Sequence, residues 1–214
     1  MKFAEKLNVA ALAMIVGSVL GASTASATVV LDQDFFPDER SNFAALISTQ
    51  DLSFGVTQTF TVGRAGILDS VEIQAGIGFP LPELRILQTS GGAPVGGAGT
   101  SVVLASTTLM TSLPDNVQRF DLSGAGLSVS VGDILAIEPV NDAIGLANWG
   151  GHSNVDYPGG QAFTFTTSNS DWTPREGGED MRFRTYVNVP EPASLALLAM
   201  GSVALLRRNR EQGC

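Results

Sequence analysis

Cysteine is almost absent from this chain of 214 residues, and its one copy, Cys214, is the last residue. A domain built from the preceding residues can therefore form no internal disulfide, and its stability must come from the packing of its own side chains. The small residues near the N-terminus are not followed by a cysteine either, which argues against a lipoprotein-type N-terminal anchor.

Positive charge is equally scarce in the central part of the chain. Residues 28 to 189 contain no lysine, and 7 arginines oppose 12 aspartates and 6 glutamates, which leaves a net charge of −11. A phosphate backbone would be repelled by such a surface, so we expect no nucleic-acid partner. Acidity of this kind is also typical of an exposed protein that has to stay soluble.

The residues that usually perform catalysis are few. The only histidine, His152, lies in the polar stretch 150–156 and is expected in a surface loop. A Ser-His-Asp set can be written from its neighbours, but no Gly-x-Ser-x-Gly turn would position the nucleophile. A single histidine without cysteines argues against zinc, and no phosphate-binding or dinucleotide motif is present. Acidic residues are too numerous to single out a pair for sugar hydrolysis. We therefore predict a protein that is not an enzyme.

Residues 1–27 have the layout of a secretory signal peptide. Two lysines precede an apolar stretch at 9–20, and Ala25 and Ala27 supply the small side chains that signal peptidase accepts. Cleavage is predicted between Ala27 and Thr28. The alternative, a membrane-spanning anchor, needs about 20 apolar residues, more than this stretch provides.

The other end, residues 189–214, also has three parts. A Val189-Pro190-Glu191-Pro192 motif precedes the apolar stretch 193–206, and Arg207, Arg208 and Arg210 close the segment. The prolines stop a strand, and the apolar stretch is predicted to be a short hydrophobic helix. Flanking arginines can snorkel, and arginines after an apolar run mark the cytoplasmic side of the membrane. The body of the protein is therefore expected outside the inner membrane.

This ordered trio resembles the sorting tail of PEP-CTERM proteins, which exosortases process in Gram-negative bacteria. The resemblance implies export across the inner membrane, transient anchoring by the tail, and cleavage near the Pro-Glu-Pro motif. It also implies release or attachment at the cell surface, often in bacteria that make exopolysaccharide and biofilm. Signal peptidase, exosortase and exopolysaccharide are thus the implied partners. A plain C-terminal membrane anchor that stays in place is the competing interpretation.

Residues 28–188 read as one all-β domain. Short strand-like runs are separated by Gly, Pro, Asn and Asp, and no window shows a helical stripe over ten or more residues. Only 38–47 leaves room for a short helix, and the glycine-rich segment 90–101 is expected to be a flexible loop between strands. The predicted strands are 58–62, 67–73, 84–87, 102–109, 117–122, 127–131, 134–140, 144–149, 161–167 and 181–187.

In two of these strands the pattern predicts which side chains share one face. In 67–73, Ile67 shares one face with Val71 and Ile73, while Leu68 falls out of phase. In 181–187, one face carries Met181, Phe183, Thr185 and Val187. Many short strands at this spacing predict a single antiparallel β-sandwich.

The order of several motifs within 52–188 resembles a jelly-roll module of bacterial exported proteins. These motifs include Gln58-Thr59-Phe60-Thr61-Val62, Tyr157-Pro158-Gly159-Gly160 and the run from Asp180 to Val187. The module is similar in outline to carbohydrate-binding and discoidin-like sandwiches. The resemblance therefore implies a jelly-roll-like fold and keeps open the possibility of a carbohydrate-binding module.

Two candidate sites follow from the side chains of this domain. Trp149, Tyr157 and Trp172 could stack against sugar rings at one end of the sandwich, or could cap the core instead. A structural Ca²⁺ could be held by carboxylates near the first and last strands, if Asp32, Asp34, Glu179 and Asp180 converge. We thus expect a non-enzymatic envelope or extracellular-matrix protein associated with exopolysaccharide. The alternatives are a carbohydrate-binding module and a hydrolase whose site has no recognisable motif.

Overall fold

The computed structural model describes residues 27–37, 43–47, 54–75, 81–97, 100–140, 147–153, 155–166, 169–175 and 179–191. Several predictions fall outside these residues. They include almost all of the signal peptide, with Ala25, and the tail from Pro192 onward, with the apolar segment 193–206 and the three arginines. No helix within the described ranges is long and apolar enough to cross a membrane.

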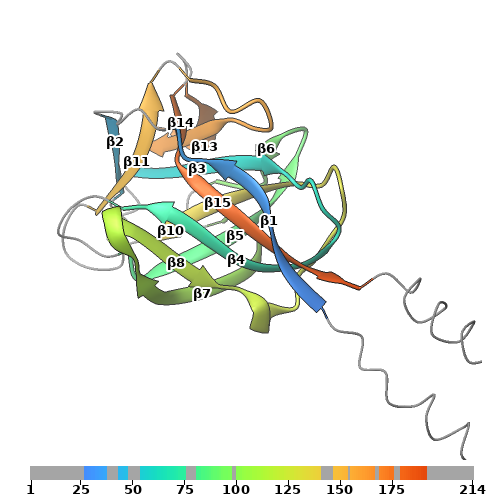
Figure 1. The fold of residues 1–214 in the computed structure, drawn as a ribbon. Coiled ribbons are helices and arrows are strands. Elements are labelled where there is room, and N and C mark those ends of the chain that lie inside the picture. Colours follow the sequence, from blue (N-terminus) through green and yellow to red (C-terminus); the bar gives the residue numbers. More distant parts are fainter. Residues whose placement is uncertain are drawn as a thin grey trace, which may run out of the picture. The chain divides into compact units, whose positions relative to one another are not determined.

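The described chain is built almost entirely of strands (Figure 1), with single 3-10 turns η1 (Pro114–Asn116) and η2 (Ser123–Ala125). The strands are β1 (Ala27–Phe35), β2 (Phe43–Ile47), β3 (Phe54–Thr61), β4 (Gly66–Gln74), β5 (Glu83–Ser90), β6 (Ala93–Pro94), β7 (Val103–Ser112), β8 (Val117–Asp121), β9 (Ser128–Val129), β10 (Ile134–Val140), β11 (Ala147–Ser153), β12 (Ala162–Thr166), β13 (Asn169–Pro174), β14 (Glu179–Met181) and β15 (Phe183–Pro190).

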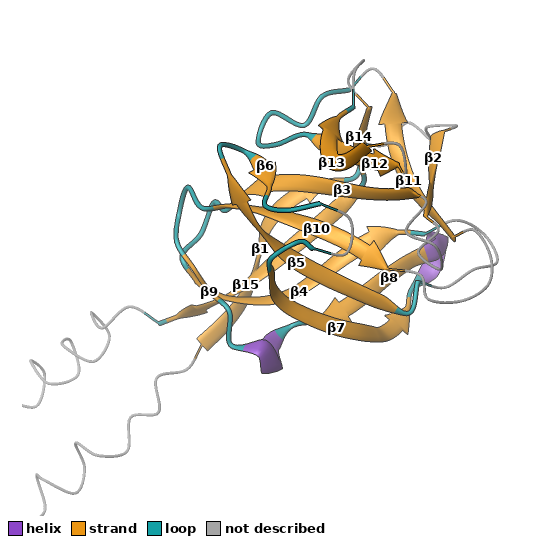
Figure 2. Cartoon of the chain, turned by 180° about the vertical axis from the view of Figure 1, so that it is seen from behind, coloured by secondary structure: helices purple, strands orange, loops and turns teal. Residues whose placement is uncertain are grey.

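One large sheet runs in the order β1-β15-β4-β8-β7-β5-β10-β3-β12-β13, and β14-β11-β2 form a small separate sheet. Strand β7 pairs with β8 on one side and with β5 on the other. It therefore joins a first half (β1, β15, β4 and β8) to a second half (β5, β10, β3, β12 and β13), which Figures 1 and 2 show from opposite sides. The predicted all-β fold is confirmed, and a jelly-roll-like sandwich is consistent with it.

The main core lies between the two halves and draws apolar side chains from both. Phe120 and Phe183 come from the first half, Phe60 and Ile86 from the second, and all four are fully buried. Alternation along each strand directs one face inward, because successive side chains point to opposite sides of a sheet. The predicted inward set Met181, Phe183, Thr185 and Val187 is buried, as expected. It is divided between β14 and β15, which separate at Arg182.

Strand β4 corrects one of the face predictions. Leu68, expected out of phase, is fully buried in the main core, whereas Ile67 is only half-buried. The register against β15 explains the difference, since Tyr186 lies opposite Ser70 and the next residue, Val187, lies opposite Leu68. Asp69 is the extra residue of a β-bulge, which changes the phase of the strand and brings Leu68 to the inward face.

Two connecting segments also differ from the prediction made from their local sequence. Within 38–47, allowed only a short helix, Phe43–Ile47 is a strand that pairs with β11. In the glycine-rich segment 90–101, the residues Ala93–Pro94 form β6 against the end of β5, and Gly97 makes an isolated bridge to Asp171. These pairings anchor parts of the segment to the second half, whereas its sequence predicted a flexible loop.

Candidate functional site

The three aromatic residues proposed as a sugar platform are all buried. Trp149 is 0% exposed, Tyr157 7% and Trp172 8%. Trp149 donates its indole N–H to the Arg182 carbonyl at 2.9 Å and belongs to the main core, as does Tyr157. Trp172 packs edge-on against Phe165 in a second cluster. Of the two possibilities, the structure shows the rings packed in cores, and they form no exposed platform.

Tyr157 shows what this burial does to a polar aromatic group. Its hydroxyl donates to Gln33 Oε1 at 2.8 Å, and its ring meets Phe183 edge-on with centroids 5.0 Å apart. Burial is the main cause that raises the pKa of Tyr157 to about 12. The side chain is thus a neutral structural link between β1 and the main core.

The carboxylates proposed for calcium near the first strand are occupied by protein donors. Asp32 accepts hydrogen bonds from the Gly63 amide at 3.0 Å and the Thr185 hydroxyl at 3.3 Å. Burial is the largest influence on Asp32 and raises its pKa. Asp34 instead pairs with the Arg184 guanidinium at 2.9 Å. The two side chains thus serve different contacts of β1.

The carboxylates near the last strands are likewise committed elsewhere. Glu179 pairs with the Arg175 guanidinium, whose Nε lies 3.0 Å away. Asp180 accepts from the amides of Tyr157 and Ala162 at 2.7 and 2.9 Å. Within the described residues, no group of three or more His, Cys, Asp or Glu side chains is arranged to hold a metal. The four predicted ligands therefore do not fit a single calcium site.

His152 lies in a strand, so the prediction of a surface loop is wrong. It is buried in β11, opposite Asp180 of β14 in the antiparallel pairing. Its Nδ1 atom has no hydrogen-bond partner among the residues that the structure describes. An unpaired buried nitrogen lowers stability, because water can no longer satisfy it. A strand at His152 could not be predicted from the sequence, because the surrounding segment is glycine-rich and lacks apolar alternation.

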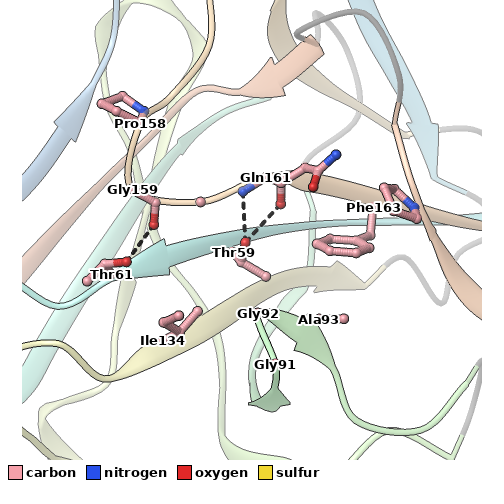
Figure 3. A pocket seen from close by; sticks show the side chains of 12 residues that line it. Thr59, Thr61, Gly91, Gly92, Ala93, Ile134, Pro158, Gly159, Gln161 and Phe163 are labelled. Carbon is pink, nitrogen blue, oxygen red and sulfur yellow. Dashed lines mark hydrogen bonds between the residues drawn. The ribbon is translucent and has the colours of Figure 1, made fainter.

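A hollow of about 530 Å³ opens on the outer side of the second half (Figure 3). Its floor consists of outward-facing residues of β3 and β10, where Thr61 lies opposite Ile134 in the register. The turn between β5 and β6 supplies one wall, and the segment 158–161 before β12 supplies another. Sequence reasoning identified these segments as turns but gave no sign that they meet around one hollow.

The wall before β12 is held tightly against β3. Thr59 Oγ1 donates to the Gln161 carbonyl at 3.0 Å and accepts from the Gln161 amide at 2.8 Å. Thr61 Oγ1 donates to the Gly159 carbonyl at 2.7 Å. A Cβ at Gly160 would lie 1.9 Å from the Thr59 carbonyl oxygen, so only glycine fits there. The shape of the hollow is therefore set by backbone contacts.

The turn between β5 and β6 is built from Gly91 and Gly92. Both have positive φ, at 61° and 85°, as the tight hairpin turn with two left-handed residues requires. Both residues line the hollow. With no side chains at the turn tip, a ligand would meet backbone on this wall.

The lining is uncharged. All twelve residues that line the hollow lie in the described part of the chain, and none of them is Asp, Glu, Lys, Arg, His or Cys. Apolar groups come from Ile134, Phe163 and two prolines, whereas hydroxyl and amide groups come from the threonines and Gln161. Because the Thr59 and Thr61 hydroxyls donate to the wall, a neutral ligand would be held by the exposed Gln161 amide, by backbone groups of the glycine turn and by apolar contact. The lining offers no side chain that transfers protons near neutral pH.

The outer face of the first half carries a different polar arrangement. Arg184, Glu72 and Arg119 lie opposite one another on β15, β4 and β8. Glu72 lies 3.5 Å from Arg119 and 3.7 Å from Arg184, and it accepts a 3.1 Å hydrogen bond from Tyr186. We call Arg184, Glu72 and Arg119 the charged row. Sequence reasoning missed it, because its members are far apart in the chain and only strand register aligns them.

The comparisons with known proteins follow this geometry. The fold defines an antiparallel all-β module with an uncharged surface hollow, and the last strand of the module runs directly into a recognisable segment. Residues 188–210 match the PEP-CTERM protein-sorting motif, as predicted from the ordered trio of the tail. The chain is therefore an exosortase-targeted secreted protein, which that sorting system places at the cell surface or outside a Gram-negative cell. Searches among curated proteins and solved structures returned no match.

Proposed function

We propose that this chain is a non-enzymatic component of the cell surface or extracellular matrix that associates with exopolysaccharide. One observation supports the delivery of this domain to the cell surface: the matched motif begins at Asn188, which is still paired with Ile67 in the sheet. No further domain lies between the sandwich and the sorting signal. The compact unit Val29–Val189 is therefore the cargo that the signal delivers.

The proposal includes a route with two cleavages. Signal peptidase would cut between Ala27 and Thr28, which would leave β1 nearly whole. Exosortase would then act near Pro190, Glu191 and Pro192 while the apolar segment 193–206 holds the chain transiently in the inner membrane. Pro190 and Glu191 are exposed at the end of β15, so this part of the motif is accessible.

The first experiment measures the intact mass of the protein in the culture medium and envelope fractions, with and without the host exosortase gene. We expect loss of residues 1–27 in both strains and loss of the tail only where exosortase is present. A tail that stays attached in both strains would contradict processing and would indicate a permanent membrane anchor.

A matched pair of variants connects that result to the motif. Replacing Pro190 and Pro192 by Ala should abolish tail removal, since exosortase is expected to recognise this motif. Pro114→Ala serves as the control, because Pro114 is exposed and lies outside the tail. Equal tail removal in both variants would show that cleavage does not depend on these two prolines.

The alternative of a hydrolase has its own test. The mature protein is incubated with the host exopolysaccharide, and newly formed reducing ends are measured over time. We expect none above the rate without protein. A release that depends on protein concentration would overturn the non-enzymatic part of the proposal.

A further inference from the structure

We propose that the hollow between β3, β10 and the two turns binds a segment of a neutral polysaccharide. The lining favours a ligand that is uncharged, is rich in hydroxyl groups and has apolar ring faces. This inference rests on the proposed association with exopolysaccharide, and it assigns that contact to one place on the molecule.

Charge selects against acidic polymers. The domain between residues 28 and 189 carries a net charge of −11, and the lining residues contribute no cation that would offset it for a carboxylate or sulfate group. Burying an unpaired anion on this surface would cost far more than burying a hydroxyl group that finds a partner. A neutral sugar chain meets neither obstacle.

The groups at the rim suit a sugar ring. Ile134 is 39% exposed, and Pro158 and Pro174 are exposed and line the same hollow, so apolar surface is available for the C–H faces of a ring. The Gln161 side chain, on the same wall as Pro158, is exposed and carries both a donor and an acceptor. Figure 3 shows Ile134 and Gln161 on two sides of the same space.

The site is also formed in advance. The Thr59 and Thr61 hydroxyls fix the wall before β12, and the glycine contacts leave that wall no room to shift toward β3. A preformed site loses little conformational freedom on binding, which favours affinity. Its volume of about 530 Å³ lies within the range of roughly 300 to 1,000 Å³ that is common for small-ligand pockets.

The test uses the mature protein in affinity electrophoresis through gels that contain a neutral polymer (dextran, galactomannan or hydroxyethyl cellulose) or the anionic polymer alginate. We expect retardation by at least one neutral polymer and none by alginate. Retardation by alginate alone, or by none of the polymers, would overturn the inference. Sorting measured by intact mass would stand in that case, so the two proposals fail separately.

Two variants locate the contact. Ile134→Arg places a long charged side chain in the hollow and should weaken retardation at least tenfold. Val131→Arg is the matched control, since Val131 is 67% exposed, precedes the same strand and does not line the hollow. Equal retardation of both variants would show that binding, if any, lies elsewhere.

A third variant covers the case in which Ile134→Arg does not fold, which circular dichroism would reveal. Gln161→Ala removes an exposed amide at the rim and should reduce retardation severalfold without loss of the folded spectrum. A folded Gln161→Ala protein with unchanged retardation would count against the hollow.

Discussion

The two halves of the large sheet share one interior but differ in how their outer faces are completed. On the first half, polar side chains of the charged row hydrogen-bond and pair across β15, β4 and β8. On the second half, apolar side chains form a second cluster, and β13 and the chain around Gly97 lie beside it. The outer face of one sheet can therefore carry polar side chains that pair with one another, or it can carry a second small core. The hollow lies beside this second core.

Two carboxylates, the buried Glu72 and the largely buried Glu138, show the same contrast at the level of single groups. Glu72 has two arginines within 4 Å and a tyrosine hydroxyl bonded to it. Among the described residues, the cation paired with Glu138 on the outer face of the second half is Arg85 at 4.0 Å, and Arg85 is closer to Glu83. Burial is the largest influence on Glu138 and raises its pKa to about 7. Burial beside a cation at 4.0 Å that is shared with the Glu83 carboxylate thus leaves Glu138 poorly stabilised in its charged form.

The largest effect is expected in the shared interior. Trp149→Ala removes a fully buried ring and leaves the Arg182 carbonyl without its indole donor. The free energy of unfolding should fall by about 4 kcal/mol, as measured by urea denaturation of the mature protein. Trp149→Phe keeps most of the volume and should lose clearly less. Equal losses would show that the hydrogen bond, and not the packing, dominates.

Glu138→Gln should change how stability depends on pH. The folded-state pKa of Glu138 is about 7, against a value of 4.5 for the free side chain. Between these values the folded state binds the proton more tightly than the unfolded state, so this contribution is greatest below pH 4.5 and is lost as the pH rises through 7. The variant should therefore be more stable than the parent at pH 8, by on the order of 3 kcal/mol at most.

The free energy of unfolding of the parent and of Glu138→Gln, measured from pH 5 to pH 8, tests the predicted pH dependence. Asp121→Asn is the control, because hydrogen bonds from Ser123 lower the pKa of Asp121 and place its titration below this range. Parallel stability curves for the parent and Glu138→Gln would contradict the assignment of the slope to Glu138.

A smaller loss is expected in the second cluster. Trp172→Ala removes a ring that packs edge-on against Phe165 and donates to the Ser101 hydroxyl at 3.2 Å. We expect a loss of about 2 kcal/mol, because the cluster is small and its neighbours can partly close the space. Near-ultraviolet circular dichroism should keep the signal of Trp149. A loss as large as that of Trp149→Ala would remove the distinction between the two cores.

The charged row should contribute least. Arg119→Gln removes one of the two cations beside Glu72, while Arg184 and the Tyr186 hydroxyl remain. The expected loss is about 0.5 to 1 kcal/mol, since partly exposed ion pairs are screened by water and salt. The loss should shrink in 1 M NaCl. A loss that salt does not change would indicate that packing of the arginine over the Tyr186 ring matters more than its charge.

Strand existence could be predicted where apolar alternation is strong. The strand predicted at 134–140 has the bounds of β10, and Met181, Phe183, Thr185 and Val187 face the core as expected. Prediction failed where pairing, and not side-chain pattern, makes the strand. The residues of β13, Asn-Ser-Asp-Trp-Thr-Pro, show no alternation, and they form a strand because β12 offers a partner.

The candidate sites show the same limit. The three aromatics and the four carboxylates were chosen by chemical type, and chemical type does not reveal burial or internal partners. Trp149 lies in the main core, and Asp180 is used by two backbone amides. The hollow, in contrast, is formed by threonines and glycines of ordinary composition. Nothing in their local sequence distinguishes them from other turn and strand residues.

The destination of this protein could be predicted from its linear sequence, because a sorting signal is a linear order of motif, apolar segment and basic end. The all-β class could be predicted as well, because alternation and turn residues act locally. Which residues meet, in contrast, depends on the tertiary fold. The bulge at Asp69, the alignment of the charged row and the closure of the hollow all depend on register between strands distant in the chain. Register is set by the packing of the whole sheet, and no short stretch of sequence contains it.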